Sequence, residues 1–165
     1  MAIRTILQLG NPDLHLISEK VSRSQLSELD AIVVDLRDTL LEFRRVHSRG
    51  RAIAAPQIGV AIRLVYVHLP QPTIMVNPSL DQMSGETLEI WDDCMSFPGL
   101  FVRVERHVSC RLSYRDRDWR RRTRLIKSST AELLQHECDH LDGILATERA
   151  VDGRAFSLGI LTPES

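Results

Sequence analysis

The sequence predicts an α+β fold, in which small antiparallel or mixed sheets pack around a central helix and an N-terminal helix covers them. Three observations predict this class. A helical repeat of apolar residues occupies positions 26–43, short runs rich in β-branched residues follow between positions 62 and 126, and a second helical pattern begins near Ser129. Helices and strands that are segregated along the chain, rather than alternating, are typical of α+β proteins.

The first expected helix follows an irregular segment, residues 1–23, in which Asn11-Pro12-Asp13 indicates a turn. Ser24 is its expected cap and Gly50 lies beyond its end. Its apolar residues recur at steps of three and four, and they are Leu26, Leu29, Ile32, Val33, Leu36, Leu40 and Phe43. This periodicity predicts an amphipathic helix that covers a sheet.

The strands and the second helix come next. Strands are expected at 62–68, 74–76, 87–91, 102–104, 108–114 and 122–126, because turn residues separate these runs. The second helix begins with a capping-box pattern at Ser129–Glu132 and should end near Gly143. For the tail after Ala150, we expect either a short helix or no regular structure.

The composition is that of a globular protein. The chain has 165 residues, with 43% hydrophobic and 26% charged residues and a formal charge of −1, so residues 1–165 are expected to form a single domain. The apolar content excludes disorder, and no apolar run approaches the roughly 20 residues that a membrane span needs. The N-terminus lacks the apolar stretch of a signal peptide, and three scattered cysteines do not make a disulfide scaffold, so a cytoplasmic location is expected.

Positive charge is concentrated in residues 103–127, which contain ten basic and three acidic residues. One interpretation is a solvated hairpin whose arginines point outward. The other is a positive edge that docks on RNA or a ribosome. No specific nucleic acid and no membrane is expected as a partner, because the overall charge is balanced and aromatic residues are not interleaved with the basic ones.

The strongest chemical signal is His136-Glu137-Cys138-Asp139-His140. On a helix, positions i and i+4 differ by about 40° in direction and about 6 Å in height, so both imidazoles can bind one ion. Glu137 then lies beside the metal, where it can accept the proton of a bound water, rather than acting as a third ligand. The alternative is two surface histidines that share a face by chance. The helix cap and the offset of Glu137 favour a metal-binding HExxH helix.

A hydrolytic site needs a third protein ligand and one open position. No histidine follows His140, and Glu148 lies too close to the helix end. Cys138 points away from the histidine face and Cys110 lies in an expected strand, so both are expected in the core. Cys94 lies in a polar stretch that follows an expected strand, which favours it as the third ligand. The other candidates remain open at this point, and they include His47, His68 and His107.

Three motifs together resemble the peptide deformylase family. The family carries a Gly-rich stretch ending in Ala-Ala-Pro-Gln, then Glu-Gly-Cys-Leu-Ser, then Gln-His-Glu-x-x-His. This chain has Gly-Arg-Ala-Ile-Ala-Ala-Pro-Gln at Gly50–Gln57, Asp-Asp-Cys-Met-Ser at Asp92–Ser96 and Gln-His-Glu-Cys-Asp-His at Gln135–His140. The resemblance covers nearly the whole chain. It implies a metal-dependent hydrolase that removes the N-formyl group from the N-terminal methionine of nascent polypeptides and releases formate.

The resemblance also implies a site. Glu137 would act as the acid/base, while Gln57 and the backbone N–H of Met95 would polarise the scissile carbonyl. The resemblance favours Fe²⁺ as the metal, with Zn²⁺, Ni²⁺ and Co²⁺ as alternatives. The metal ligands would be Cys94, His136 and His140. Contacts with a formyl-Met peptide substrate would come from Gly50, Ala52 and Asp93.

The chain departs from the family pattern at four positions. Asp92 replaces Glu, Asp93 replaces Gly, Met95 replaces Leu, and Ala52 replaces Gly. If position 93 needs a positive φ, Asp tolerates it less well than Gly. Two carboxylates beside the thiolate are expected to line the mouth of the site and to favour neutral or cationic substrates. The methyl group of Ala52 is expected to narrow the groove.

Some alternatives remain at this stage. Gln57 can instead be a buried amide that holds the turn after Pro56, and Gln135 or Asp139 can orient a metal ligand. One rival function is an amidase on the same scaffold that acts on another N-acylated or small-molecule substrate, as Asp93 and Ala52 suggest. The other is a non-catalytic metal-binding or ribosome-docking protein, as the basic stretch suggests.

Overall fold

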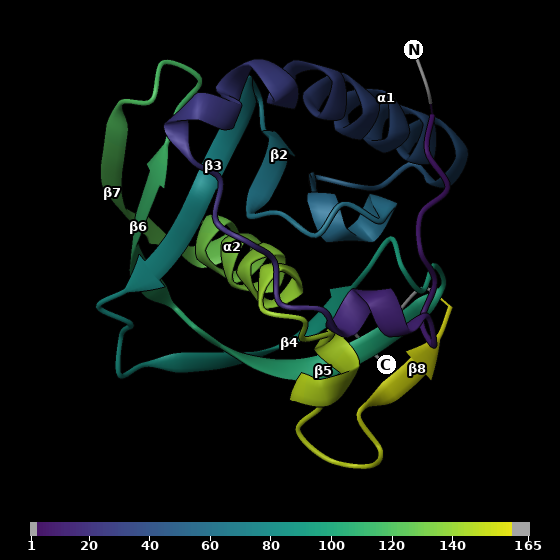
Figure 1. The fold of residues 1–165 in the computed structure, drawn as a ribbon. Coiled ribbons are helices and arrows are strands. Elements are labelled where there is room, and N and C mark those ends of the chain that lie inside the picture. Colours follow the sequence, from purple (N-terminus) through teal and green to yellow (C-terminus); the bar gives the residue numbers. More distant parts are fainter. Residues whose placement is uncertain (1–2, 160–165) are drawn as a thin grey trace.

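A computed structural model describes residues 3–159 of the chain and contains two antiparallel sheets. The five-stranded sheet has the order β1-β2-β3-β6-β7 and the three-stranded sheet the order β4-β5-β8 (Figure 1). The first sheet consists of β1 (Ala52–Ala54), β2 (Leu64–His68), β3 (Pro72–Asp81), β6 (Ser109–Arg115) and β7 (Arg121–Lys127). The second consists of β4 (Thr87–Asp93), β5 (Leu100–His107) and β8 (Phe156–Leu158).

Two helices complete the fold, α1 (Leu29–His47) and α2 (Ser128–Leu141). Figure 1 shows α2 at the centre, between the two sheets, while α1 runs along the outside. The predicted α+β class, with a central helix and an N-terminal covering helix, is therefore confirmed. Within residues 3–159, no helix combines the length and the hydropathy that a membrane span requires.

The pleat of β2 divides the hydrophobic core between the two helices. Leu64 and Tyr66 pack in one cluster with Leu36 and Leu40 of α1. Their neighbours Val65 and Val67 face the opposite way and pack with residues of α2, among them Leu133, Leu134 and Leu141. Successive side chains of a strand point to opposite faces, so a strand buried on both sides reads as a continuous apolar run. This arrangement fixes α2 against the sheet.

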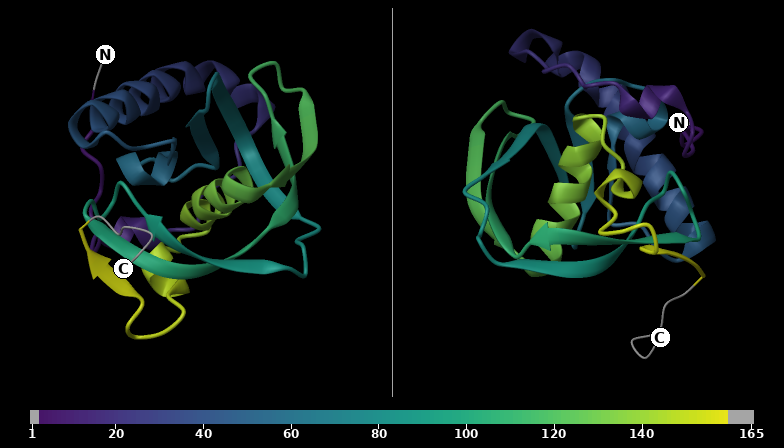
Figure 2. Two further views of the ribbon diagram at one scale, coloured as in Figure 1. Left: turned by 180° about the vertical axis from the view of Figure 1, so that it is seen from behind. Right: turned by 90° about the horizontal axis from the view of Figure 1, so that it is seen from below.

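The N-terminal segment is irregular, as expected, but it connects all three motifs. The N–H of Leu7 donates to the carbonyl of Gln57 at 2.8 Å, and the N–H of Leu9 donates to the carbonyl of Ser96 at 2.8 Å. The N–H of Ser18 then donates to the carbonyl of Leu141, at the end of α2, at 2.9 Å. The segment follows this course along one side of the molecule in Figure 2. It therefore holds the motif-bearing segments in position relative to one another.

Several boundaries differ from the sequence predictions. The first helical region opens as a 3₁₀-helix, η2 (Arg23–Glu28), and becomes α-helical only at Leu29, so Ser24 is not its cap. The backbone N–H of Ser22, one residue before η2, donates to Gln25 instead. The capping box at Ser129 does not form either, because α2 begins at Ser128 and Glu132 forms an ion pair with Arg51.

The expected strands are present, and two further ones were not predicted. β3 is longer than expected and contains a register shift between Val76 and Ser79. β1 and β8 have three residues each, too few to produce a periodic signal. The described part of the tail after Ala150, for which a short helix or no regular structure was expected, contains strand β8 instead. Three further 3₁₀-helices are η1 (Pro12–His15) at the expected turn, η3 (Ala55–Ile58) after β1 and η4 (Ala146–Arg149) before the tail. Residues 160–165 of the tail lie outside the described residues.

Candidate active site

Three buried side chains converge between α2 and the end of β4. His136 and His140 lie one turn apart on α2, with their Nε2 atoms 3.2 Å apart. The Sγ atom of Cys94, which directly follows β4, lies 3.2 Å from Nε2 of His140. The ligand atoms of all three lie within 4.8 Å of one another, and within residues 3–159 no other group of His, Cys, Asp and Glu side chains converges in this way.

The donor set fits one divalent cation. In a tetrahedral site with metal–nitrogen distances of about 2.0–2.1 Å and a metal–sulfur distance of about 2.3 Å, the ligand atoms lie roughly 3.3–3.6 Å apart. Two of the three observed separations, both 3.2 Å, are close to these values, and the third lies within 4.8 Å. Three protein ligands leave a fourth position for water or substrate. The cluster therefore forms a single metal site from Cys94, His136 and His140.

The remaining ligand candidates lie elsewhere. Cys110 is buried in the core that β6 shares with α2, and His107 forms a 2.7 Å hydrogen bond through Nδ1 with the carbonyl of Ser84. The ring of His47 packs against Phe43 on α1. Gln135 does not orient a ligand, because its side chain binds the backbone of His107 and Ala131. These residues serve the packing of the fold.

A chain of buried ion pairs orients His136. Its Nδ1–H donates to Oδ2 of Asp92 at 3.0 Å, which directs Nε2 toward the cluster. Arg106 donates to the same oxygen at 3.0 Å, and its other amino group donates to Asp139 at 2.5 Å. Arg149 adds a second hydrogen bond to Asp139. Asp139 was expected to orient a metal ligand, and it contacts His136 only indirectly, through Arg106 and Asp92.

The pKa values of the residues around the metal site are set by burial and by nearby charges. Burial alone would raise the pKa of the Asp92 carboxyl, but the His136 and Arg106 cations outweigh it and hold the pKa well below its usual range. Burial, together with His136, lowers the pKa of His140 well below its usual value. His140 is thereby kept neutral, as a metal ligand must be. For His136, burial would lower the pKa, but the Asp92 carboxylate and the nearby Cys94 sulfur raise it well above its usual value.

The pleat of β4 separates the two aspartates of the second motif. Asp92 is buried and faces the metal site, whereas Asp93 faces the opposite way and is exposed. Asp93 is the last residue of β4 and has an extended backbone, so this position does not require a positive φ. Both aspartates line the pocket, as expected, but neither carboxylate is unpaired. Arg106 and His136 compensate the charge of the buried Asp92, and Arg49 lies 3.6 Å from Asp93.

Glu137 lines a pocket of about 200 Å³ beside the metal site. Its side chain is 3% exposed, and Oε2 has no hydrogen-bond partner within the described part of the chain. Burial raises the pKa of its carboxyl to about 7, with Asp92 adding to the rise and His136 and Arg51 opposing it. A buried, unpaired carboxylate costs stability unless it has a partner that these residues do not supply, such as a bound water.

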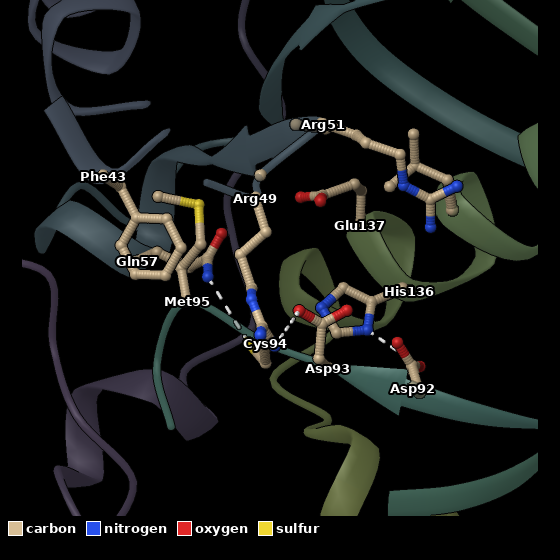
Figure 3. Close-up of a pocket in the computed structure, with 13 residues that line it drawn as sticks. Phe43, Arg49, Arg51, Gln57, Asp92, Asp93, Cys94, Met95, His136 and Glu137 are labelled. Carbon is tan, nitrogen blue, oxygen red and sulfur yellow. Dashed lines mark hydrogen bonds and ion pairs between the residues drawn. The ribbon is translucent and has the colours of Figure 1, made fainter. Parts of the chain in front are cut away.

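The two ends of the Gln57 side-chain amide have different surroundings. Its Oε1 accepts the N–H of Ala54 at 2.9 Å and so holds the turn at η3. Its Nε2 faces the metal site, 3.6 Å from Sγ of Cys94 (Figure 3), and lies 3.3 Å from Oγ of Ser96. The backbone N–H of Met95 has no acceptor among residues 3–159. Two hydrogen-bond donors therefore lie beside Cys94.

The other residues expected to contact substrate all line this pocket, and they are Gly50, Ala52 and Asp93. Gly50 has a φ of +119°, and a Cβ there would come within 3.2 Å of Leu40, so the position requires glycine. Arg49 and Arg51 also line the pocket and were not among the predicted residues. The sequence could have indicated them, because the two arginines flank Gly50 at the start of the first motif.

Comparison with known proteins agrees with this geometry. The family model for polypeptide deformylase matches residues 3–155. The chain belongs to the peptide deformylase family. Peptide deformylase 1 of Prochlorococcus marinus is 34% identical over 170 residues, covering 94% of this chain and 85% of that relative.

Two solved deformylase structures match the fold closely. The peptide deformylase of Thermotoga maritima superposes with a TM-score of 0.83 at 25% identity, covering 92% of this chain and 100% of that one. A Met-Ala-Ser-bound class I type b deformylase of Acinetobacter baumannii gives a TM-score of 0.80 at 28% identity, covering 90% of this chain and 98% of that one.

The family fixes the activity as well as the fold. This deformylase is a metal-dependent hydrolase that removes the N-formyl group from nascent polypeptides. The two rival functions, an amidase for unrelated substrates and a non-catalytic binding protein, lose their support. The departures at Ala52, Asp92, Asp93 and Met95 are therefore variations within a deformylase site.

Proposed function

We propose that the deformylase hydrolyses the formamide of N-formyl-methionyl peptides with Glu137 as the group that carries the proton. The observation that carries this role is the free Oε2 of a buried Glu137, beside a three-ligand site with one open position. A divalent cation bound there supplies Lewis acidity, which lowers the pKa of water from about 16 toward about 7 and polarises the carbonyl. Fe²⁺ is the metal we propose.

The chain's own groups then perform the proton transfers. Glu137 accepts a proton from the attacking water at Oε2 and donates it to the amine nitrogen as the formyl C–N bond breaks. The pKa of about 7 suits both steps, because the carboxyl can exist in either form near neutral pH. Asp92 and Arg106 keep the His136 ring in its orientation during the reaction.

Gln57 and Met95 are proposed to stabilise the developing negative charge. The Gln57 amide and the Met95 N–H both lie beside Cys94 and donate hydrogen bonds without carrying a charge. Removal of one such donor costs about 3 kcal/mol in well-studied hydrolases. The bond from Oε1 of Gln57 to the Ala54 N–H supports the proposal, because it orients the amide before substrate binds.

The topology favours an extended peptide as substrate. β1 ends the five-stranded sheet and β4 ends the three-stranded one, so each has an edge without a partner strand among residues 3–159. Ala52 of β1 and Asp93 of β4 both line the pocket. An extended peptide can bind such edges through backbone hydrogen bonds. We propose that Gly50, Ala52 and Asp93 contact this peptide.

Three further expectations remain predictions, namely residues 1–165 as one domain, a cytoplasmic location and ribosome docking through residues 103–127. The structure offers docking little support. Six arginines of this stretch form ion pairs within the protein, which reduces the charge available to a partner. The six are Arg103, Arg106, Arg111, Arg117, Arg120 and Arg122.

An anaerobic assay of formate release tests the proposal. Iron-loaded protein is incubated with a formyl-Met tripeptide and, as the control, with the matching acetyl-Met tripeptide. We expect formate from the first and no acetate from the second, because the family to which the chain belongs removes formyl groups. Release of neither product by metal-loaded protein would overturn the proposed function.

A further inference from the structure

An ion pair lies across the entrance of the active-site pocket. Arg49 comes from the loop before β1, and Asp93 comes from the end of β4 on the other side. The Nη1 atom of Arg49 lies 3.6 Å from Oδ2 of Asp93. Figure 3 shows the Arg49 side chain extending over the pocket toward Asp93, in front of Cys94.

The β4–β5 hairpin gives Arg49 a second support. Asp93 is paired directly with Phe101 of β5, and the guanidinium carbon of Arg49 lies 5.3 Å from the centre of the Phe101 ring. A cation over an aromatic face is attracted to it, so ring and carboxylate hold the same guanidinium. The Arg49 and Asp93 side chains are 34% and 44% exposed, so a peptide entering from solvent can reach both.

Neither member of this pair has another charged partner among residues 3–159. Asp92 is held by Arg106 and His136, and Arg51 is held by Glu132 at 2.5 Å. Arg49 and Asp93 form an ion pair only with each other. Replacement of either one therefore leaves a single uncompensated charge at the entrance.

We propose that the Arg49–Asp93 ion pair determines substrate selectivity, by favouring peptides with a neutral residue after the formyl-methionine. This inference rests on the proposed function and names its substrate class. A neutral residue passes between two charges that compensate each other. An acidic residue is attracted by Arg49 and repelled by Asp93, and a basic residue experiences the reverse. A charged residue can bind one member only by breaking the Arg49–Asp93 pair, so both charged peptides bind less well than a neutral one and neither gains over the other.

This proposal replaces the expectation drawn from the sequence. Asp92 and Asp93 as free carboxylates would favour cationic over anionic peptides. With Asp92 neutralised inside and Asp93 paired, we expect formyl-Met-Lys and formyl-Met-Asp peptides to react at similar rates. The glycine of the family motif has no side chain with which to form this pair, so the selectivity belongs to the residues of this chain.

The test measures kcat/KM of the metal-loaded full chain with formyl-Met-Ala-Ser, formyl-Met-Lys-Ser and formyl-Met-Asp-Ser. For the unaltered chain, we expect the alanine peptide to react fastest. Asp93→Asn should raise the Asp-to-Lys ratio about two- to fivefold, and Arg49→Gln should lower it by a similar factor, as expected for exposed charges. The change should be larger in KM than in kcat, and salt near 0.5 M should reduce it.

Matched controls separate a local effect from a change of net charge. Asp81→Asn and Arg111→Gln alter an exposed ion pair between β3 and β6, outside the pocket, and should leave the ratio unchanged. The exchanged pair, Arg49→Asp with Asp93→Arg, should return the ratio toward that of the unaltered chain. Dissociation constants of the same peptides, measured by calorimetry on metal-loaded Glu137→Gln protein, should show the same reversal without turnover.

The outcomes separate the two proposals. Failure to release formate from every peptide would overturn the proposed function, whatever the Arg49 and Asp93 variants do. Turnover with the same Asp-to-Lys ratio in the unaltered chain, Asp93→Asn and Arg49→Gln would overturn the selectivity proposal alone. If one variant fails to fold, the other variant and the peptide dissociation constants still decide the question.

Discussion

At the scale of single residues, the sharpest prediction concerns Glu137. Glu137→Gln keeps the size of the side chain but cannot accept a proton, so we expect formate release to fall about 10²- to 10⁴-fold. The metal should stay bound, because Glu137 is not among the three converging ligands. Metal content and kcat measure the two effects. Glu86→Gln, at an exposed position before β4, is the control, and near-normal turnover by the Glu137 variant would contradict the role.

The sequence predicts residues best where local geometry places them. The spacing of His136 and His140 determines that both face one ion, because a helix brings i and i+4 together. Cys94 needed the family motif, since its approach to α2 depends on the tertiary fold. Arg106 was not predicted at all, because its place between Asp92 and Asp139 arises only when β5 packs beside α2.

The same limit explains the error about the two aspartates. In the sequence, Asp92 and Asp93 are neighbours and look equivalent. In an extended strand they point to opposite faces, so one enters the metal site and the other reaches the entrance. The expected strand ended at Trp91, two residues short of the observed end of β4 at Asp93. A small error in a strand boundary thus changed a conclusion about substrate charge.

At the scale of elements, Gly143 holds the end of α2 against the N-terminal segment. Its φ is +72°, and a Cβ there would lie 2.5 Å from the carbonyl oxygen of His15. Gly143→Ala should therefore lower the free energy of unfolding by more than the roughly 1–2 kcal/mol that the left-handed conformation alone costs. Denaturant unfolding measures this. Gly153→Ala is the control, since nothing lies within 4 Å of its Cβ position, and equal stability of the two variants would contradict the packing argument.

The elements differ in how far the local sequence determines their conformation. α1 was predictable because apolar residues recur along one of its faces. α2 was predicted from the capping-box pattern at Ser129–Glu132, although that box does not form. β1 was not, since three residues carry no periodicity, and its strand conformation comes from pairing with β2. β8 likewise exists through its pairing with β5. The 3₁₀ start of the first helical region was hidden because Leu26 continues the same apolar repeat at a three-residue step.

At the scale of the whole molecule, the metal site joins parts of the fold that are otherwise separate. Cys94 belongs to the cluster packed around β5, whereas His136 and His140 belong to α2, which also packs on the five-stranded sheet. A cation bound by all three therefore links the two sheets through α2. The Arg49–Asp93 ion pair connects the two sheets in the same way at the pocket entrance, because Arg49 precedes β1 and Asp93 ends β4.

This linkage predicts that metal binding stabilises the entire fold. A ligand that binds only the folded state adds about 2.7 kcal/mol when its free concentration is 100 times its dissociation constant. For a chain of this size, that corresponds to roughly 5–10 °C in Tm. We therefore expect a chelator to lower the Tm of the metal-loaded protein by about this amount. Cys94→Ala should unfold at one temperature with or without chelator, whereas Cys110→Ala, which alters a cysteine of the other core cluster, should keep the difference. If chelation left the Tm of the unaltered chain unchanged, the three side chains would converge without forming a metal-dependent connection between the sheets.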